Sequence, residues 1–200
     1  MVAKERDAER IQVWRARFIA AISKVPARRV VYLDETGVTI DMTRTYAWGL
    51  SGQRVVDSIP RNRSRVLTIA GAIGIDGVRA VMAYEGATTK ELFLRFVREA
   101  LVPALRRGDV VVMDNLGAHH AYGVRSAIES AGARLLYLPP YHPELNPIEL
   151  AWAKWKNLLR KLGARTYQDL AAAVIETKEQ LTGSDLRGWY NHVRRLGQVA

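Results

Sequence analysis

The sequence of 200 residues contains no cysteine, which excludes disulfide bonds, thiol catalysis and zinc sites built on thiolates. Long apolar runs are missing too, because uncharged stretches such as residues 66–75 reach only about half the length that spans a bilayer. The first seven residues carry charges of both signs and no apolar stretch, so we expect no signal peptide. These absences predict a soluble cytoplasmic protein that makes no membrane contact.

Acidic residues are the scarcer charged class, with 20 Asp and Glu against 30 Lys and Arg and a net charge of +10. The excess lies at the two ends: residues 1–29 and residues 150–200 each carry a net charge of +5, and the residues between them are balanced. Basic flanks around a neutral centre are typical of a protein that contacts a polyanion with its ends. The alternative is an arginine-rich composition that only covers a solvated surface.

The apolar pattern predicts an α/β fold whose mixed sheet is flanked by helices. Three strands come first, and the Asp76-Gly77 pair between the second and third is typical of a hairpin. Helices and strands then alternate, as in a parallel arrangement, and no Gly-rich phosphate loop is present. The expected strands are residues 29–33, 66–74, 78–84, 109–113 and 134–138; the expected helices are residues 5–24, 122–130, 167–181 and 185–196, with two more opening near residues 88 and 146. Residues 37–65 are rich in turn signals and predict a hairpin or an insertion.

Two aspartates stand where buried apolar strands are expected to end. Asp34 and Asp114 each follow four apolar residues. Strand ends in α/β sheets form the crevice in which ligands bind. Two carboxylates that face each other there repel unless a cation lies between them, and oxygen ligands suit Mg²⁺ or Mn²⁺. Each aspartate taken alone is explained as well by the capping of a turn.

Glu149 is open to two readings. Asn146 is a favoured N-cap, Pro147 fits the first helical position, and Glu149 stands three residues after the cap, as in a capping box. The same first turn could instead direct the Glu149 carboxylate to a metal ion. The local sequence favours neither reading.

Three segments together resemble the catalytic domain of DDE transposases, and more narrowly the bacterial insertion-sequence branch of the mariner superfamily. They are Val-Val-Tyr-Leu-Asp-Glu at residues 30–35, Val-Val-Val-Met-Asp-Asn at residues 110–115, and Pro-Pro-Tyr-His-Pro-Glu-Leu-Asn-Pro-Ile-Glu at residues 139–149. Between Asp114 and Glu149 lie 34 residues, the spacing of that branch. Trp48-Gly49 and the Asp-Asn-x-x-x-His pattern that ends at His119 also fit.

This resemblance implies a ribonuclease-H-like fold with Asp34, Asp114 and Glu149 as a catalytic, metal-binding triad. Two Mg²⁺ or Mn²⁺ ions per active site would support strand cleavage and then attack of a DNA 3′-hydroxyl on target DNA. The implied partners are transposon ends and target DNA, commonly at a TA step, together with a second copy of the chain in a homodimer on the DNA. The implied location is the bacterial cytoplasm, in association with the nucleoid.

Complete transposases of this family carry N-terminal helix-turn-helix domains, and the roughly 28 residues before the first expected strand are too few for one. We therefore expect the DNA-binding part to be missing. The expected organisation is a linker helix over residues 1–27, the catalytic domain over residues 28–165, and a C-terminal helical extension of that domain over residues 166–200.

Other residues are expected to support the triad or to contact DNA. The supporting set, placed around the metal ligands, is Glu35, Asn115, His119 and Asn146. The basic residues expected to follow the DNA backbone are Arg54, Arg61, Arg63, Arg65, Lys154, Lys156, Arg160 and Lys161. Trp152 and Trp155 lie at core spacing in the last long helix, which favours a core role over base stacking.

Two other functions remain possible on the sequence. The first is another ribonuclease-H-like metal-dependent nuclease, such as a Holliday-junction resolvase, which would lack the proline-rich segment before the last carboxylate. The second is a non-catalytic DNA-binding remnant of a transposase, which would commonly have lost a triad residue. A phosphatase of the haloacid dehalogenase type needs Asp-x-Asp at the first strand, where this chain reads Asp34-Glu35-Thr36.

Overall fold

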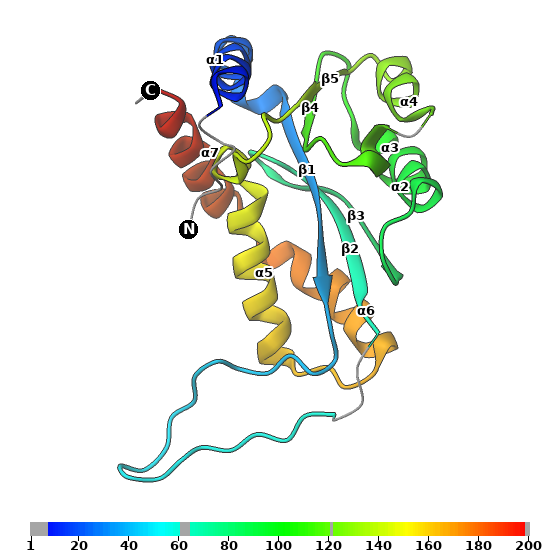
Figure 1. Ribbon diagram of the computed structural model, residues 1–200. Coiled ribbons are helices and arrows are strands. Elements are labelled where there is room, and N and C mark those ends of the chain that lie inside the picture. Colours follow the sequence, from blue (N-terminus) through cyan, green and yellow to red (C-terminus); the bar gives the residue numbers. More distant parts are fainter. Residues whose placement is uncertain (1–7, 61–64, 121, 199–200) are drawn as a thin grey trace.

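The computed structural model describes residues 8–60, 65–120 and 122–198, and its centre is one five-stranded sheet (Figure 1). The strands lie in the order β3-β2-β1-β4-β5. Their bounds are β1 Val30–Val38, β2 Leu67–Gly74, β3 Gly77–Glu85, β4 Val110–Met113 and β5 Arg134–Tyr137. The pairs β1–β2 and β2–β3 are antiparallel, whereas β1–β4 and β4–β5 are parallel. The predicted mixed sheet is confirmed.

Strand β1 is longer than its apolar residues predict, and this corrects the expected position of Asp34. Its parallel pairing with β4 ends at Tyr32, but its antiparallel pairing with β2 continues to Val38. The polar second half of β1 therefore remains a strand, because β2, which is buried along its whole length, supplies the backbone partners. Asp34 lies in the middle of β1 rather than at its end.

The helices follow the predicted order. Their bounds are α1 Glu9–Ser23, α2 Lys90–Phe96, α3 Val102–Ala104, α4 Val124–Ser130, α5 Ile148–Leu162, α6 Tyr167–Thr177 and α7 Gly183–Gln198. A π-helical segment, Val97–Leu101, joins α2 to α3, so the chain stays helical through Pro103. Helix α5 ends at Leu162 and is capped by Gly163, whose positive φ of 64° suits a residue without a Cβ atom.

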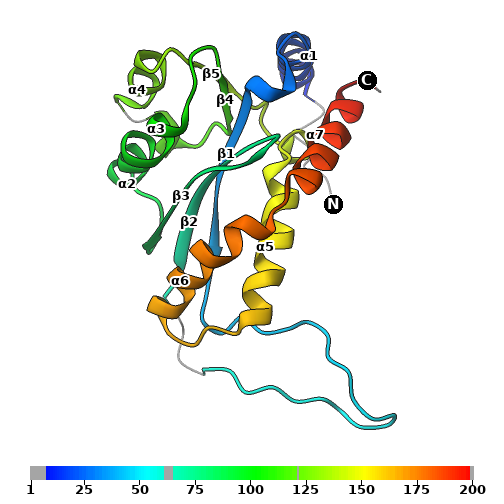
Figure 2. The same ribbon diagram turned by 180° about the vertical axis from the view of Figure 1, so that it is seen from behind.

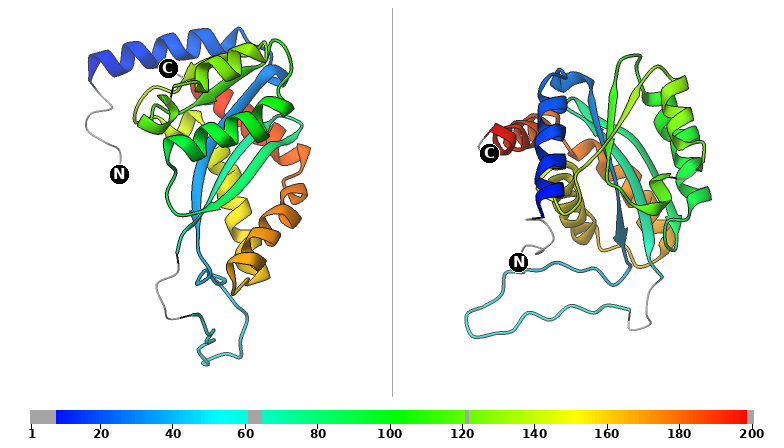
Figure 3. Two further views of the ribbon diagram at one scale, coloured as in Figure 1. Left: turned by 90° about the vertical axis from the view of Figure 1, so that its right-hand side faces the viewer. Right: turned by 45° about the horizontal axis from the view of Figure 1, so that its top comes forward.

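Two layers of helices cover the two faces of the sheet (Figures 2 and 3). Alternate residues of β1 point to opposite faces, so Tyr32 joins one hydrophobic cluster while Val31 and Leu33 join the other. Helices α1, α5, α6 and α7 contribute to the cluster of Tyr32, and α2 and α4 contribute to the cluster of Leu33. No helix in the described part of the chain is long and apolar enough to cross a bilayer.

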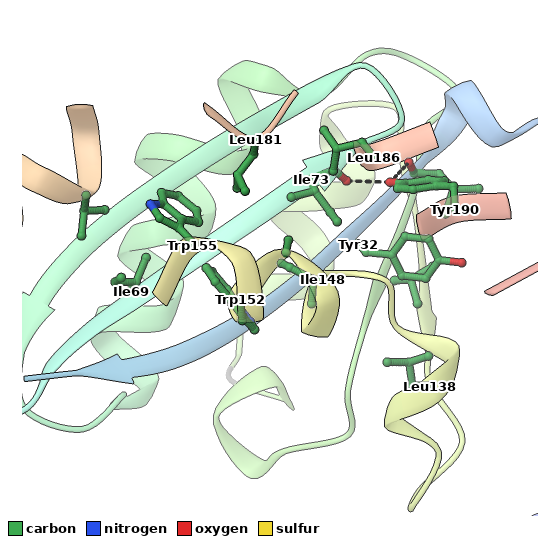
Figure 4. Packing of buried hydrophobic residues seen from close by; sticks show 14 of the residues in the cluster. Tyr32, Ile69, Ile73, Leu138, Ile148, Trp152, Trp155, Leu181, Leu186 and Tyr190 are labelled. Carbon is green, nitrogen blue, oxygen red and sulfur yellow. Dashed lines mark hydrogen bonds between the residues drawn. The ribbon is translucent and has the colours of Figure 1, made fainter. Parts of the chain in front are cut away.

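Helix α5 packs against the sheet through a stripe of large apolar side chains (Figure 4). Trp152 and Trp155 are 4% and 1% exposed, so the predicted core stripe is confirmed. The same layer is closed by Tyr190 of α7, whose hydroxyl donates to the carbonyl oxygens of Val30 and Ile73 at 3.1 and 2.9 Å. Strands β1 and β2 are thus joined to the C-terminal helix.

A long connection between β1 and β2 leaves the body of the molecule as an extended arm (Figure 1). Among its described residues, 39–60 and 65–66, there is no helix or strand. The expected insertion is present, whereas the hairpin alternative is not formed in these residues. Large apolar side chains of the arm lie open to solvent, including Tyr46, Trp48 and Val56.

Candidate active site

A cavity of about 410 Å³ lies where β4 and β5 end, between β1 and the start of α5. The three carboxylates that the sequence singled out, Asp34, Asp114 and Glu149, all line it. The rest of its wall is Asn115, Leu116, Leu138, Pro139, Pro140, Tyr141, His142, Pro143 and Asn146. Residues up to 115 positions apart in the sequence thus share one cavity.

Asp34 and Asp114 come together because of the strand register. Tyr32 of β1 is level with Val112 of β4 in the parallel pair, and each aspartate follows two residues later. Because side chains alternate along a strand, this spacing directs both aspartates to the face that α5 covers. Two hydrogen bonds hold the Asp34 carboxylate: the backbone N–H of Glu35 donates to Oδ1 at 2.8 Å, and the Trp152 indole Nε1–H donates to Oδ2 at 3.3 Å.

The acidity of Asp34 is strongly perturbed. Burial raises the pKa of its carboxyl from the ordinary 3.8 to about 7, against the lowering effect of the Glu35 backbone hydrogen bond. The negative charges of Glu149, Glu35 and Asp114 raise this pKa further. The negative charges of these carboxylates therefore repel one another, and a bound cation would relieve this repulsion.

Asp114 is held by a buried histidine. The Nδ1 atom of His119 lies 2.5 Å from Asp114 Oδ1, and its Nε2 atom lies 3.0 Å from Glu35 Oε2. Burial by itself would lower the pKa of His119, but the hydrogen bonds to Asp114 and Glu35 outweigh it and raise the pKa to about 10. His119 is thus protonated at neutral pH and donates from both ring nitrogens. Glu35 points to the opposite face of β1 and reaches the cavity only through this histidine.

Glu149 does not complete a capping box. The Asn146 Oδ1 atom accepts a hydrogen bond from the backbone N–H of Ile148 at 3.4 Å, which is the cap expected of an asparagine. Among the described residues, the Glu149 carboxylate makes no reciprocal hydrogen bond to the backbone of Asn146. Desolvation raises the pKa of Glu149, with a further increase from Asp114 and an opposing effect of Lys156. The carboxylate faces the cavity.

Comparison with known proteins establishes the family. Residues 29–171 match the family described as DDE superfamily endonuclease. The chain belongs to this family. No curated protein matches the sequence.

Solved structures of Mos1 transposase share the fold of this DDE endonuclease domain. The catalytic domain of Mos1 mariner transposase aligns with a TM-score of 0.72 and 14% identity, covering 99% of this chain and 93% of that one. The Mos1 paired-end complex with the left transposon end aligns with a TM-score of 0.74 and 17% identity, covering 95% of this chain. The match spans 61% of the Mos1 chain in that complex. The predicted ribonuclease-H-like α/β fold is confirmed.

The donor set of the DDE cavity fits a hard divalent cation, because it consists of carboxylate and amide oxygens. As the side chains stand, no three His, Asp or Glu side chains in the described ranges are close enough together to enclose one ion. Asp34 is hydrogen-bonded to the Trp152 indole and Asp114 is paired with His119.

The basic residues expected to contact DNA lie in different surroundings. Lys154 pairs with Asp185 of α7 at 2.5 Å, whereas Arg65 lies 3.3 Å from Glu85 on the surface and stays largely exposed. Arg160 and Lys161 line a groove of about 830 Å³ between α5 and the arm, together with Arg44, Tyr46 and Trp48. Lys156 is close enough to Glu149 to affect its pKa, and Arg54 is exposed on the arm. Arg61 and Arg63 lie outside the described residues.

His142 is a titratable residue of the cavity wall that was not among the site residues expected from the sequence. His142 is 2% exposed, its Nδ1 atom lies 2.8 Å from Glu144 Oε1, and its Nε2 atom has no hydrogen-bond partner among the described residues. Its place inside the proline-rich segment was the signal that could have pointed to it. In the structure it directly follows Tyr141, which has a positive φ of 62°. Glu144, the other carboxylate of the proline-rich segment, contacts His142 and does not line the cavity.

Proposed function

We propose that the chain is the catalytic domain of a DDE transposase of the bacterial insertion-sequence branch, which cleaves DNA and joins 3′-hydroxyl ends to target DNA. The observation that carries the proposal is the convergence of Asp34, Asp114 and Glu149 on one cavity in a chain of the DDE endonuclease family. The fold shared with the Mos1 catalytic domain supports it.

Asp34, Asp114 and Glu149 would hold two Mg²⁺ or Mn²⁺ ions. Bound there, the ions would activate the attacking hydroxyl and stabilise the leaving oxygen of the phosphodiester. The protein's own contribution is to gather the carboxylates: the β1–β4 register places the two aspartates, and the first turn of α5 places Glu149. His119 and Glu35 orient Asp114, and Asn146 caps the helix that carries Glu149.

DNA is the substrate that the charge distribution favours. The groove formed by Arg44, Arg160 and Lys161 offers three basic side chains, two of them on the helix that also carries Glu149. A backbone phosphate held there would keep a neighbouring stretch of the strand along α5, toward the cavity. Transposon ends, a TA target step, a homodimer on DNA and a separate N-terminal helix-turn-helix part complete the proposal.

The test is metal-dependent nicking of supercoiled plasmid DNA, followed on gels in Mg²⁺ and in Mn²⁺. Glu149→Gln keeps the length and polarity of the side chain but removes its charge, so nicking should fall by orders of magnitude while folding is unchanged. The same substitution at Glu176, exposed on α6, is the matched control and should nick like the parent. Parental nicking by the Glu149→Gln protein would exclude Glu149 from the site and overturn the triad.

A further inference from the structure

Trp152 is more than a core residue of helix α5. It lies three positions after Glu149, so both side chains project from neighbouring positions on one side of the helix. Its ring is 4% exposed, yet its only polar atom, Nε1, donates to Oδ2 of Asp34 at 3.3 Å. A residue of the hydrophobic layer thus contacts a carboxylate of the cavity directly.

The strand opposite Asp34 is shaped to admit the indole. In the β1–β2 pair the partner of Asp34 is Gly71, within a strand that is buried throughout. A Cβ atom at Gly71 would lie 2.6 Å from Cη2 of Trp152, closer than any real contact. Glycine weakens a strand interior, so its presence here is explained by the close approach of the indole ring.

The other side of the ring is fixed as well. Trp155 stacks on Trp152 with ring centroids 5.5 Å apart and planes inclined by 23°, and both are seen side by side in Figure 4. The Trp155 indole donates to Thr177 Oγ1 at 2.8 Å, and this hydroxyl donates to the carbonyl oxygen of Ala173 at 2.6 Å. Trp152 is therefore held between Gly71 and an anchored neighbour, with little freedom to turn away from Asp34.

We propose that Trp152 is a positioning residue that orients the Asp34 carboxylate for metal binding. The inference rests on the proposed function, because it takes Asp34 as a metal ligand. An indole N–H donates only one hydrogen bond and carries no charge, so it fixes Oδ2 without neutralising the carboxylate or competing as a ligand. The remaining lone pairs stay available to a cation. Outer hydrogen bonds of this kind typically contribute about 10- to 100-fold to metal affinity.

The test compares the same substitution at two tryptophans. Trp152→Phe removes the hydrogen bond to Asp34 and keeps an apolar ring, whereas the control, Trp189→Phe, changes a half-buried tryptophan of α7 that makes no hydrogen bond to Asp34 within the described residues. Mn²⁺ is titrated into each protein, and binding is followed by calorimetry and by the rise in thermal unfolding temperature. We expect the Mn²⁺ dissociation constant to rise about 10-fold or more for Trp152→Phe and to stay at the parental value for Trp189→Phe. In nicking assays, the rate of the Trp152→Phe protein should recover at saturating Mn²⁺.

A second pair of variants tests the same contact without changing Trp152. Gly71→Ala should displace the indole and weaken Mn²⁺ binding, whereas Gly77→Ala, where a Cβ atom meets nothing within 4 Å, should not. Because both changes act on one hydrogen bond, the double variant with Trp152→Phe should bind no more weakly than the weaker single variant. If circular dichroism shows that either Gly71→Ala or Trp152→Phe does not fold, the other variant alone tests the role of Trp152.

Two outcomes separate the inference from the proposed function. Asp114→Asn should abolish the Mn²⁺ response, and a parental response in that variant would overturn the metal site itself. If Asp114→Asn abolishes the response while Trp152→Phe and Gly71→Ala bind Mn²⁺ like the parent, the metal site stands and the role of Trp152 is refuted.

Discussion

Asp34→Asn is expected to change how the stability of the metal-free protein depends on pH. Burial and neighbouring charges raise the pKa of Asp34 from 3.8 to about 7, so the folded protein binds this proton more tightly than the unfolded chain. The stabilisation from the proton is complete below about pH 4 and is lost as the pH rises through about 7. The difference between a pKa of 3.8 and a pKa of about 7 corresponds to about 4 kcal/mol, of which about 2 kcal/mol is lost between pH 5 and pH 7.

Asparagine resembles the protonated carboxyl in shape and carries no charge at any pH. The Asp34→Asn protein should therefore match the parent near pH 4 and exceed its unfolding free energy by up to about 4 kcal/mol at pH 8. Urea unfolding in EDTA at pH 4, 5, 7 and 8 measures this difference, and the other titrating groups cancel in the comparison. Asp41→Asn, on the exposed arm, controls for the loss of one negative charge.

If the parent and the Asp34→Asn protein lose stability in parallel between pH 5 and pH 8, Asp34 is ionised throughout and the carboxylates of the cavity do not oppose one another. Added Mn²⁺ should also remove most of the parental loss at pH 8, because the cation favours the ionised carboxylates of the folded state.

Three further outcomes are expected. His119→Gln removes a charged, fully buried hydrogen-bond donor from Asp114 and Glu35 and should lower the unfolding free energy at pH 7 by about 3 kcal/mol in urea unfolding. Because the pKa of His119 is raised from 6.5 to about 10, the difference from the parent should shrink as the pH rises from about 7 to about 10. DNA affinity, measured by fluorescence anisotropy, should fall steeply with salt, and Lys161→Ala should reduce the slope of log affinity against log salt by about one. Asp114→Asn should eliminate Mg²⁺-induced thermal stabilisation without making the metal-free protein more stable, since the substitution also removes the ion pair with His119.

Most of the fold could be predicted from local patterns in the sequence. Strand β4 consists of four apolar residues and is buried throughout, and Asp76-Gly77 forms the turn between β2 and β3. These features depend on neighbours within a few residues, where periodicity and turn preference act. The same holds for the start of α5, where Asn146 caps the helix before Pro147.

Contacts between residues far apart in the sequence could not be predicted from such patterns. Lys154 resembles a free basic residue on a helix surface, but α7 brings Asp185 to within 2.5 Å of it. The Asp-Asn-x-x-x-His pattern links His119 to Asp114, but the fold also places it against Glu35, 84 positions earlier. Neither contact can be predicted from the spacing of nearby residues, because the two side chains in each contact come from different elements.

The sequence by itself determined the mixed sheet and the order of its elements, since apolar periodicity is a property of the chain, and its resemblance to DDE transposases pointed to the three carboxylates. Only the tertiary structure decided how those carboxylates are held. Pairing with β2 extends β1 past Asp34, so its environment is a buried strand rather than a loop. The absence of a Cβ atom at Gly71 lets Trp152, 118 positions away, reach Asp34. The charge state of Asp34 follows from the burial and the opposing charges that these contacts create.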